Sequence, residues 1–226
     1  MTTGVLALWM DIDSQAEDEC TEWYIREHVP DRIAVPTYVR ARRFKALAGA
    51  GYLASYDATT AEGLAHPGYM ALLDAISDWG LRMRGAFSGT ARETFRCLAR
   101  AGSGEGAFVA TVRFGADDSA RAGLLAGLAA ACPALAGRRG ILSAEVWEAA
   151  PDIRARMDAR RITGTRDARV AAAVLIEGTS PAAIDAVLAD GLDPGGLARR
   201  GARDLQIDRY AFQFCARKPT AQEPTP

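Results

Sequence analysis

The sequence predicts an α+β fold in which two ferredoxin-like βαββαβ units form one barrel. Strand-like and helix-like segments follow the order β-α-β-β-α-β over residues 1–100. The same order recurs after a glycine-bearing segment, residues 101–106, which is the expected linker. The helices of such a unit cover only one face of its sheet, so each half needs the other to cover the second face.

The first predicted strand, residues 5–12, is apolar apart from Asp11, as expected of a strand buried on both faces. By alternation, Trp9 and Asp11 share one face, which we assign to the barrel interior. A helix is expected to begin at Asp13-Ser14, where a capping residue precedes acidic first turns. It should end near His28, because Pro30 disfavours helical geometry at the residue before it.

The rest of the first half continues the ferredoxin-like order. Residues 38–47 and 52–58 read as two strands joined by a glycine-bearing link, which indicates a hairpin. A helix is expected to begin at Pro67, a residue suited to a first helical turn, with His66 as its cap. It should break around residues 77–80 and resume over 82–87, before a fourth strand at 90–99.

The second half, residues 107–217, repeats this order more faintly, with little residue identity to the first. Its expected elements are strands at 107–114, 140–148, 168–177 and 205–215, helices at 117–132 and 180–190, and a polar crossing through Thr165. Residues 218–226 carry three prolines and are expected to form a disordered tail.

Composition disfavours several classes of function. Lys plus Arg total 27 against 28 Asp plus Glu, so no basic excess supports nucleic-acid binding. The four cysteines form no CxxC pair and there are only two histidines, which leaves no zinc signature and no predicted metal site. No apolar run approaches the roughly 20 residues of a membrane helix. We therefore expect a cytoplasmic protein with reduced thiols that binds neither nucleic acid nor membrane.

The most informative segment spans residues 22–44. On a helix, Cys20, Trp23, Tyr24, Glu27 and His28 fall on one stripe. Tyr24 and His28 are i, i+4 neighbours whose polar ends can meet a common partner. At the expected helix C-terminus, the helix dipole would favour the charged form of His28.

This segment resembles EthD-like proteins of the dimeric α/β-barrel superfamily, which show a Trp-Tyr-x-x-Glu-His-x-Pro helix followed by an Arg-Arg-aromatic strand. The matching residues are Trp23, Tyr24, Glu27, His28, Pro30, Arg32, Arg42, Arg43 and Phe44. Thr37 departs from the pattern, where a glycine is expected. The resemblance covers residues 1–100 and implies a barrel with a central cleft. The superfamily includes small monooxygenases, lactone isomerases, haem-dependent enzymes and proteins without known activity.

Two residues are candidates for catalysis. His28 is predicted to be a general base or acid, because the ordinary pKa of histidine is nearest neutrality; the alternative is a histidine that caps its helix. Tyr24 is a candidate hydrogen-bond donor to a substrate carbonyl, or else a core aromatic residue.

Four further residues are predicted to bind the ligand: Trp9, Asp11, Tyr56 and Arg43. Trp9 and Tyr56 would form walls of the cleft. Asp11 would be a buried carboxylate that needs a cationic partner, which Arg42 or Arg43 would provide, either as a structural pair or as a polar part of the cleft.

These residues predict a protein that binds a small organic ligand. As an enzyme it would act without a cofactor on a small apolar or aromatic carbonyl compound of a catabolic or biosynthetic pathway, by proton transfer or by oxygenation. The alternative is a non-catalytic binding or accessory protein. No cofactor is expected; haem is a minor alternative, because some members of the resembling superfamily ligate iron through a histidine. A homodimer through helix faces or sheet edges stays open.

Overall fold

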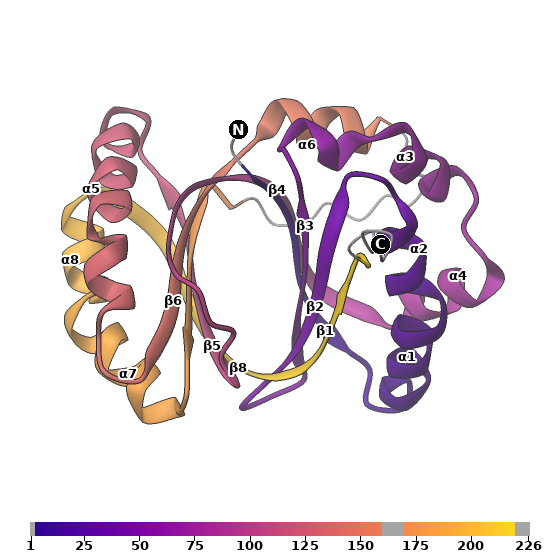
Figure 1. The fold of residues 1–226 in the computed structure, drawn as a ribbon, viewed down its shortest axis with the longest axis horizontal. Coiled ribbons are helices and arrows are strands. Elements are labelled where there is room, and N and C mark those ends of the chain that lie inside the picture. The colour runs from indigo at the N-terminus through magenta and orange to yellow at the C-terminus, as the bar shows by residue number, and fades with distance from the viewer. Residues whose placement is uncertain (1–2, 160–169, 220–226) are drawn as a thin grey trace, which may run out of the picture.

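The computed structural model describes residues 3–159 and 170–219, and these form a closed barrel with helices on two sides (Figure 1). The barrel strands of the described residues are β1 (Gly4–Ile12), β2 (Tyr38–Ala46), β3 (Gly51–Ala58), β4 (Phe87–Gly102), β5 (Phe108–Ala116), β6 (Ile141–Ala149), β7 (Ala172–Gly178) and β8 (Ala202–Arg217).

The strand order confirms the duplicated ferredoxin-like architecture. Around the barrel the strands follow β1-β3-β2-β8-β5-β7-β6-β4. The first half therefore has the order β4-β1-β3-β2, and the second has the matching order β8-β5-β7-β6. Antiparallel pairing of β2 with β8 and of β4 with β6 joins the two sheets at both edges. In each half, the helices cover one face of the sheet, and the sheet of the other half covers the second face.

Apart from one helix of the second half, the helices of each half cover the outer face of that half's sheet (Figure 1). Their bounds are α1 (Glu17–Trp23), η1 (Tyr24–His28), α2 (Val29–Ala34), η2 (Glu62–Ala65), α3 (Pro67–Asp74), α4 (Asp78–Gly85), α5 (Asp118–Ala136), α6 (Pro151–Asp158), α7 (Pro181–Asp190) and α8 (Pro194–Arg199). The capping role expected of His66 is confirmed, since its Nδ1 accepts a hydrogen bond from the Gly68 amide at 3.0 Å.

The prediction that the first helix ends near His28 is wrong. Residues Tyr24–His28 form a π-helical turn, in which the Val29 amide donates to the Tyr24 carbonyl, and the helix then continues to Ala34. Pro30 lies in the first turn of α2, where its missing amide hydrogen is tolerated. His28 therefore lies within a continuous helical segment, and the expected stabilisation of its charged form by a helix C-terminus does not apply.

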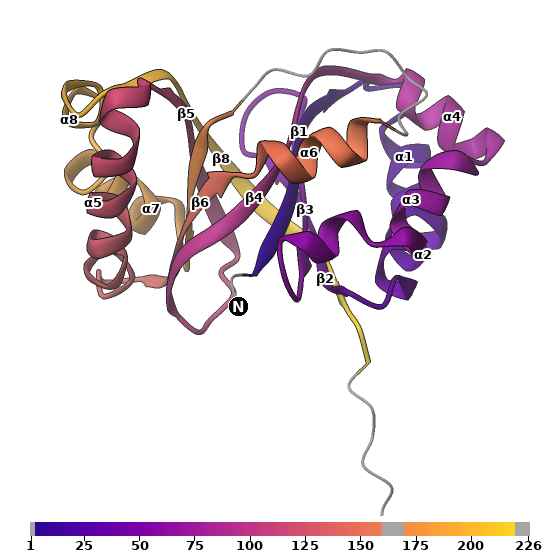
Figure 2. The ribbon, with the colours of Figure 1, turned by 90° about the horizontal axis from the view of Figure 1, so that it is seen from above.

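Two helices of the second half were not predicted. α6 falls in the segment expected to be a polar crossing, and α8 follows α7. α6 follows a strand of the second half but lies toward the helices of the first half (Figure 2), where Ile153 and Met157 join their core. β4 runs through Gly102, so the first residues of the predicted linker belong to a strand. Residues 160–169 and 220–226, which include part of the predicted crossing and tail, lie outside the described residues.

α5 is long and apolar enough, by length and composition, to cross a membrane. It packs against β4 and β6, and its buried face contributes Leu124, Leu128 and Leu135 to the core of the second half. These contacts are those of a partly buried core helix in a globular barrel.

The barrel interior is filled by side chains from both halves. Trp9, Phe44, Phe95 and Trp147 belong to its apolar cluster. Arg42 of β2 donates to Glu177 of β7 there at 2.5 Å, and the half-exposed Arg100 of β4 pairs with the buried Glu145 of β6 at 3.0 Å. The interior therefore connects the halves through buried packing and ion pairs.

Candidate functional site

A cavity of about 700 Å³ lies outside the barrel, between the sheet of the first half and its helices. The cleft expected at the barrel centre is therefore misplaced, because large side chains fill the interior. The cavity is lined by Leu6, Leu8, Trp23, His28, Arg32, Tyr56, Tyr69, Leu73, Leu81, Arg84, Gly85, Phe87, Ser88, Gly89, Thr90 and Arg92. Its volume is within the range of small-molecule sites.

His28 projects from the π-helical turn into a group of aromatic rings. Its ring centroid lies 4.3 Å from that of Trp23, 4.8 Å from that of Tyr24 and 5.9 Å from that of Tyr56. A π turn adds one residue to a helical turn and so changes which side chains face the sheet; such turns recur at functional sites. This local geometry brings the predicted residues His28 and Tyr56 together on the cavity wall.

The pKa of His28 lies well below its ordinary value. Burial is the main cause, and the positive charges of Arg32, Arg84 and Arg43 act in the same direction. His28 is therefore neutral at pH 7. Its buried Nδ1 has no hydrogen-bond partner among the described residues, although buried polar atoms usually have one.

The hydroxyls of Tyr24 and Tyr56 are also buried, and neither makes a hydrogen bond of good geometry with a described residue. Burial is the main cause that raises the pKa of both phenols. Both side chains therefore keep their proton at neutral pH and can donate a hydrogen bond. Tyr56 lines the cavity, whereas Tyr24 is fully buried behind His28.

Three arginines line the cavity: Arg32, Arg84 and Arg92. Arg92 lies 3.4 Å from the Tyr69 hydroxyl and 3.2 Å from a carboxylate oxygen of Asp158 in α6. Burial opposes ionisation of Tyr69, but the charges of Arg92 and Arg32 outweigh it and lower the pKa of this phenol. Sequence reasoning missed Arg84, Arg92 and Tyr69 as site residues. Arg32 was visible only as part of the helix motif.

Three predicted ligand-binding residues lie away from the cavity. Trp9 points into the barrel, where its Nε1 donates to Thr111 at 3.2 Å. Arg43 lies between two rings, 4.2 Å from the Tyr24 centroid and 4.6 Å from that of Tyr52. It supports Tyr24 from behind and does not line the cavity.

Asp11 does not form the predicted buried pair with Arg42 or Arg43. The side chain is exposed, after a register shift between Trp9 and Asp11 in the pairing of β1 with β4. Arg42 pairs instead with Glu177 from the second half. The irregularity turns Asp11 away from the interior face that alternation assigns to it.

Glu27 connects the π-helical turn to α4 at the cavity rim. Its Oε1 accepts hydrogen bonds from Trp23 Nε1 at 2.9 Å and from Ser77 Oγ at 2.5 Å. Ser77 in turn caps α4 by accepting from the Gly80 amide at 2.9 Å. The helix motif thus positions one wall of the cavity as well as contributing to its lining.

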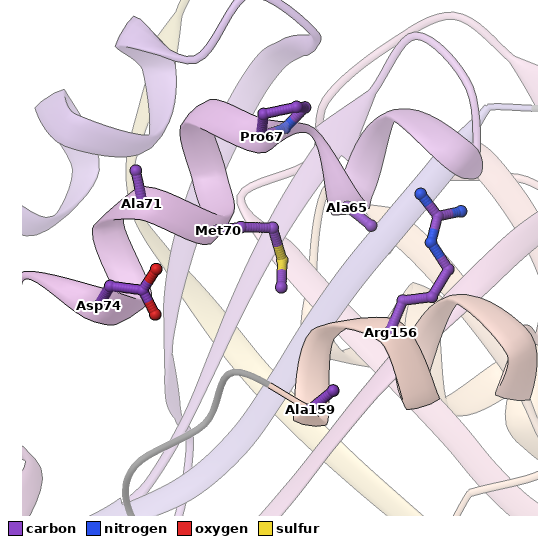
Figure 3. Close-up of a pocket in the computed structure, with 7 residues that line it drawn as sticks. All are labelled: Ala65, Pro67, Met70, Ala71, Asp74, Arg156 and Ala159. Atoms are coloured by element: carbon purple, nitrogen blue, oxygen red, sulfur yellow. The ribbon is translucent and has the colours of Figure 1, made fainter.

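A second hollow, of about 400 Å³, lies between α3 and α6 (Figure 3). Met70 and Ala71 line it from α3, and Arg156 from α6. It is smaller than the cavity beside His28, and no aromatic side chain lines it.

His28 is a poor fit to a haem ligand. A metal-bound histidine generally donates its other ring nitrogen to an acceptor that orients the ring, and Nδ1 of His28 has no partner. The described residues also contain no cluster of three or more His, Cys, Asp or Glu arranged to hold a metal ion. We therefore derive no chemistry through a haem.

Comparison with solved structures shows the same architecture over the full chain. An anthrone oxidase-like protein aligns with a TM-score of 0.68 at 12% identity, covering 99% of this chain and 96% of that chain. A candidate monooxygenase from Fusobacterium nucleatum aligns with a TM-score of 0.62 at 4% identity, covering 96% and 95%. A Listeria monocytogenes ferredoxin-fold protein related to antibiotic biosynthesis monooxygenases aligns with a TM-score of 0.51 at 10% identity, covering 95% and 96%.

The chain therefore shares with these proteins the fold of a closed eight-stranded antiparallel barrel built from two ferredoxin-like units. These identities are low, so the likeness concerns the fold alone. No protein-family model and no curated protein sequence matches the chain.

Proposed function

We propose that this α/β-barrel protein binds a small aromatic or alicyclic carbonyl compound in the cavity beside His28 and transfers a proton on it without a cofactor. One observation carries the proposal. Two buried polar atoms without a hydrogen-bond partner of good geometry among the described residues, His28 Nδ1 and the Tyr56 hydroxyl, lie at one cavity, and the Tyr24 hydroxyl lies behind this wall, next to Tyr56. Buried polar groups without partners are costly, so a ligand that bonds them would be stabilised there.

Neutral His28 would accept a proton from the carbon next to the carbonyl group. Tyr56 would donate a hydrogen bond to the carbonyl oxygen and stabilise the resulting enolate, and Tyr24 is a second donor at greater depth. The depressed pKa of His28 makes its protonated form a stronger acid than an ordinary imidazolium, so it would return the proton readily to the enolate. The net change is the exchange or relocation of one proton, with no oxidant required.

We further propose that residues 1–100 are EthD-like and that the protein is cytoplasmic; the helix motif supports the first statement and the free cysteines support the second. The descriptions of similar structures as an anthrone oxidase-like protein and monooxygenases guide the choice of a ring-bearing carbonyl compound. We also propose a homodimer. The closed barrel does not require one, because both sheet faces are already covered within one chain.

Deuterium exchange at the activated carbon of 2-tetralone, followed by proton NMR in D₂O, tests the reaction. Wild-type protein should accelerate the exchange over buffer. His28→Gln should lower the acceleration by about 100-fold or more, the usual contribution of a general base. Tyr56→Phe should lower it by a smaller factor because Tyr24 remains.

The matched control is His66→Asn, which removes the only other histidine, keeps a capping side chain on α3 and lies outside the cavity lining. It should retain the wild-type rate. Exchange that survives His28→Gln unchanged would refute the assigned base. Binding of 2-tetralone without any exchange would favour the alternative, a protein that only binds its ligand.

A further inference from the structure

Three arginines and no acidic residue stand among the described residues that line the cavity. Arg32, Arg84 and Arg92 contribute to its wall, while the remaining lining residues are apolar, aromatic or neutral. His28 adds no charge at neutral pH, because its pKa lies well below the ordinary value. Asp158, which pairs with Arg92, is one acidic neighbour outside the lining.

Arg32 is the arginine whose surroundings are unusual. The residue is only 6% exposed, yet no described carboxylate lies within ion-pairing distance of its guanidinium group. The contact that the structure does show is with the Tyr69 ring, 5.9 Å from guanidinium carbon to ring centroid. Buried charges are normally paired, because removal from water without a partner is costly. A buried guanidinium group that faces a cavity without an ion-paired carboxylate therefore indicates a site for an anion.

Arg92 is less available than Arg32 to bind an anion. It is already occupied by Asp158 and by the hydroxyl of Tyr69. Arg32 lies one helical turn beyond His28, and its charge is the first of those that lower the pKa of His28. An anionic group held by Arg32 would therefore place the body of the ligand beside His28 and Tyr56.

We propose that the natural ligand carries a carboxylate, which pairs with Arg32, on an apolar ring-sized body. The inference rests on the proposed ligand site and names its substrate class: a carbonyl compound that is also a carboxylic acid. The planar guanidinium group matches a carboxylate with two parallel hydrogen bonds. Leu6, Leu8, Leu73, Leu81 and Phe87 form apolar walls for the remainder of the molecule.

Calorimetric titration with 2-naphthoate and with naphthalene-2-carboxamide tests the charge requirement. The two probes share a ring system and nearly the same shape, but only the first is charged. Wild-type protein should bind the carboxylate about 10-fold or more tightly than the amide, as expected for charge-assisted hydrogen bonds. In Arg32→Met the two affinities should become nearly equal, and Arg32→Lys should retain part of the preference.

Arg26→Met is the matched control, because Arg26 lies in the same helical segment with its side chain 70% exposed. It should bind both probes as the wild type does. The unliganded Arg32→Met protein should melt no lower than wild type, because an unpaired buried charge has been removed; this also checks folding.

Equal affinity of wild type for both probes, or an unchanged carboxylate preference in Arg32→Met, would overturn the inference, as would failure of both probes to bind. The proton-transfer proposal fails separately. If the protein prefers the carboxylate but does not accelerate exchange, the proton-transfer reaction is refuted and the ligand class is supported. If it accelerates exchange but does not prefer the carboxylate, the ligand class is refuted and the reaction is supported.

Discussion

Glu177 is the residue at which the joining of the two halves can be tested most directly. Its carboxylate, from the second half, accepts hydrogen bonds from Arg42 of the first half at 2.5 Å and from the Gly106 amide at 3.0 Å. The side chains of Arg42 and Glu177 are 1% and 3% exposed. Glu177→Leu therefore leaves a buried guanidinium group without its counter-ion.

The expected loss follows from these contacts. Breaking a buried ion pair from one side costs about 3–5 kcal/mol, and the lost bond to Gly106 adds about 1 kcal/mol. The free energy of unfolding should fall by about 4–6 kcal/mol. At about 2–4 °C per kcal/mol for a chain of this size, Tm should fall by about 8–24 °C.

Equilibrium unfolding in guanidinium chloride, followed by circular dichroism, measures this loss. The double variant Arg42→Met, Glu177→Leu should recover most of it, because replacing both ions by apolar side chains removes the unpaired charge. As a control, Glu22→Ala breaks the exposed pair with Arg26 and should cost less than about 1 kcal/mol. A double variant as unstable as the sum of its single changes would refute the reasoning.

Three further outcomes follow from other parts of the molecule. The free energy of unfolding of wild type relative to His28→Gln should fall by about 1.4 kcal/mol per pH unit below about pH 6.5. The reason is that His28 takes up a proton in the unfolded chain but stays neutral when it is buried in the folded protein. Denaturant titrations between pH 7.5 and 5.5 that give a constant difference would contradict this. Asp193→Ala should lower the free energy of unfolding by about 1 kcal/mol in the same assay, since its carboxylate caps α8, and Asp193→Asn should restore most of it. Trp9→Phe should reduce thermal stability but leave probe affinity unchanged, since its indole bonds to Thr111 inside the barrel; a change in affinity would place Trp9 at the site after all.

Much of the fold could be predicted because strand alternation and element order are local properties of the chain. The first strand shows the limit of this reasoning. Its two faces were separated correctly, but both are apolar, and alternation alone does not say which face meets the ligand. Trp9 and Asp11 were therefore assigned to the site together, whereas the cavity lies on the face of Leu6 and Leu8.

The helix motif illustrates a second limit. His28 and Tyr56 both line the cavity, but the π-helical turn that presents His28 has no sequence signature that separates it from a helix end before Pro30. Arg92 and its partner Asp158 come from segments far apart in the chain. Their proximity depends on α6 crossing toward the first half, which the element order does not predict.

The two halves share one strand order but differ in how their outer layers are filled. Leucines of α5 close the layer of the second half, while the first half keeps a space beside His28. In a symmetric pair of separate chains, any substitution that fills one layer would fill both. Covalent joining removes that coupling, so the outer layer of one half can be densely packed while the other half keeps a cavity.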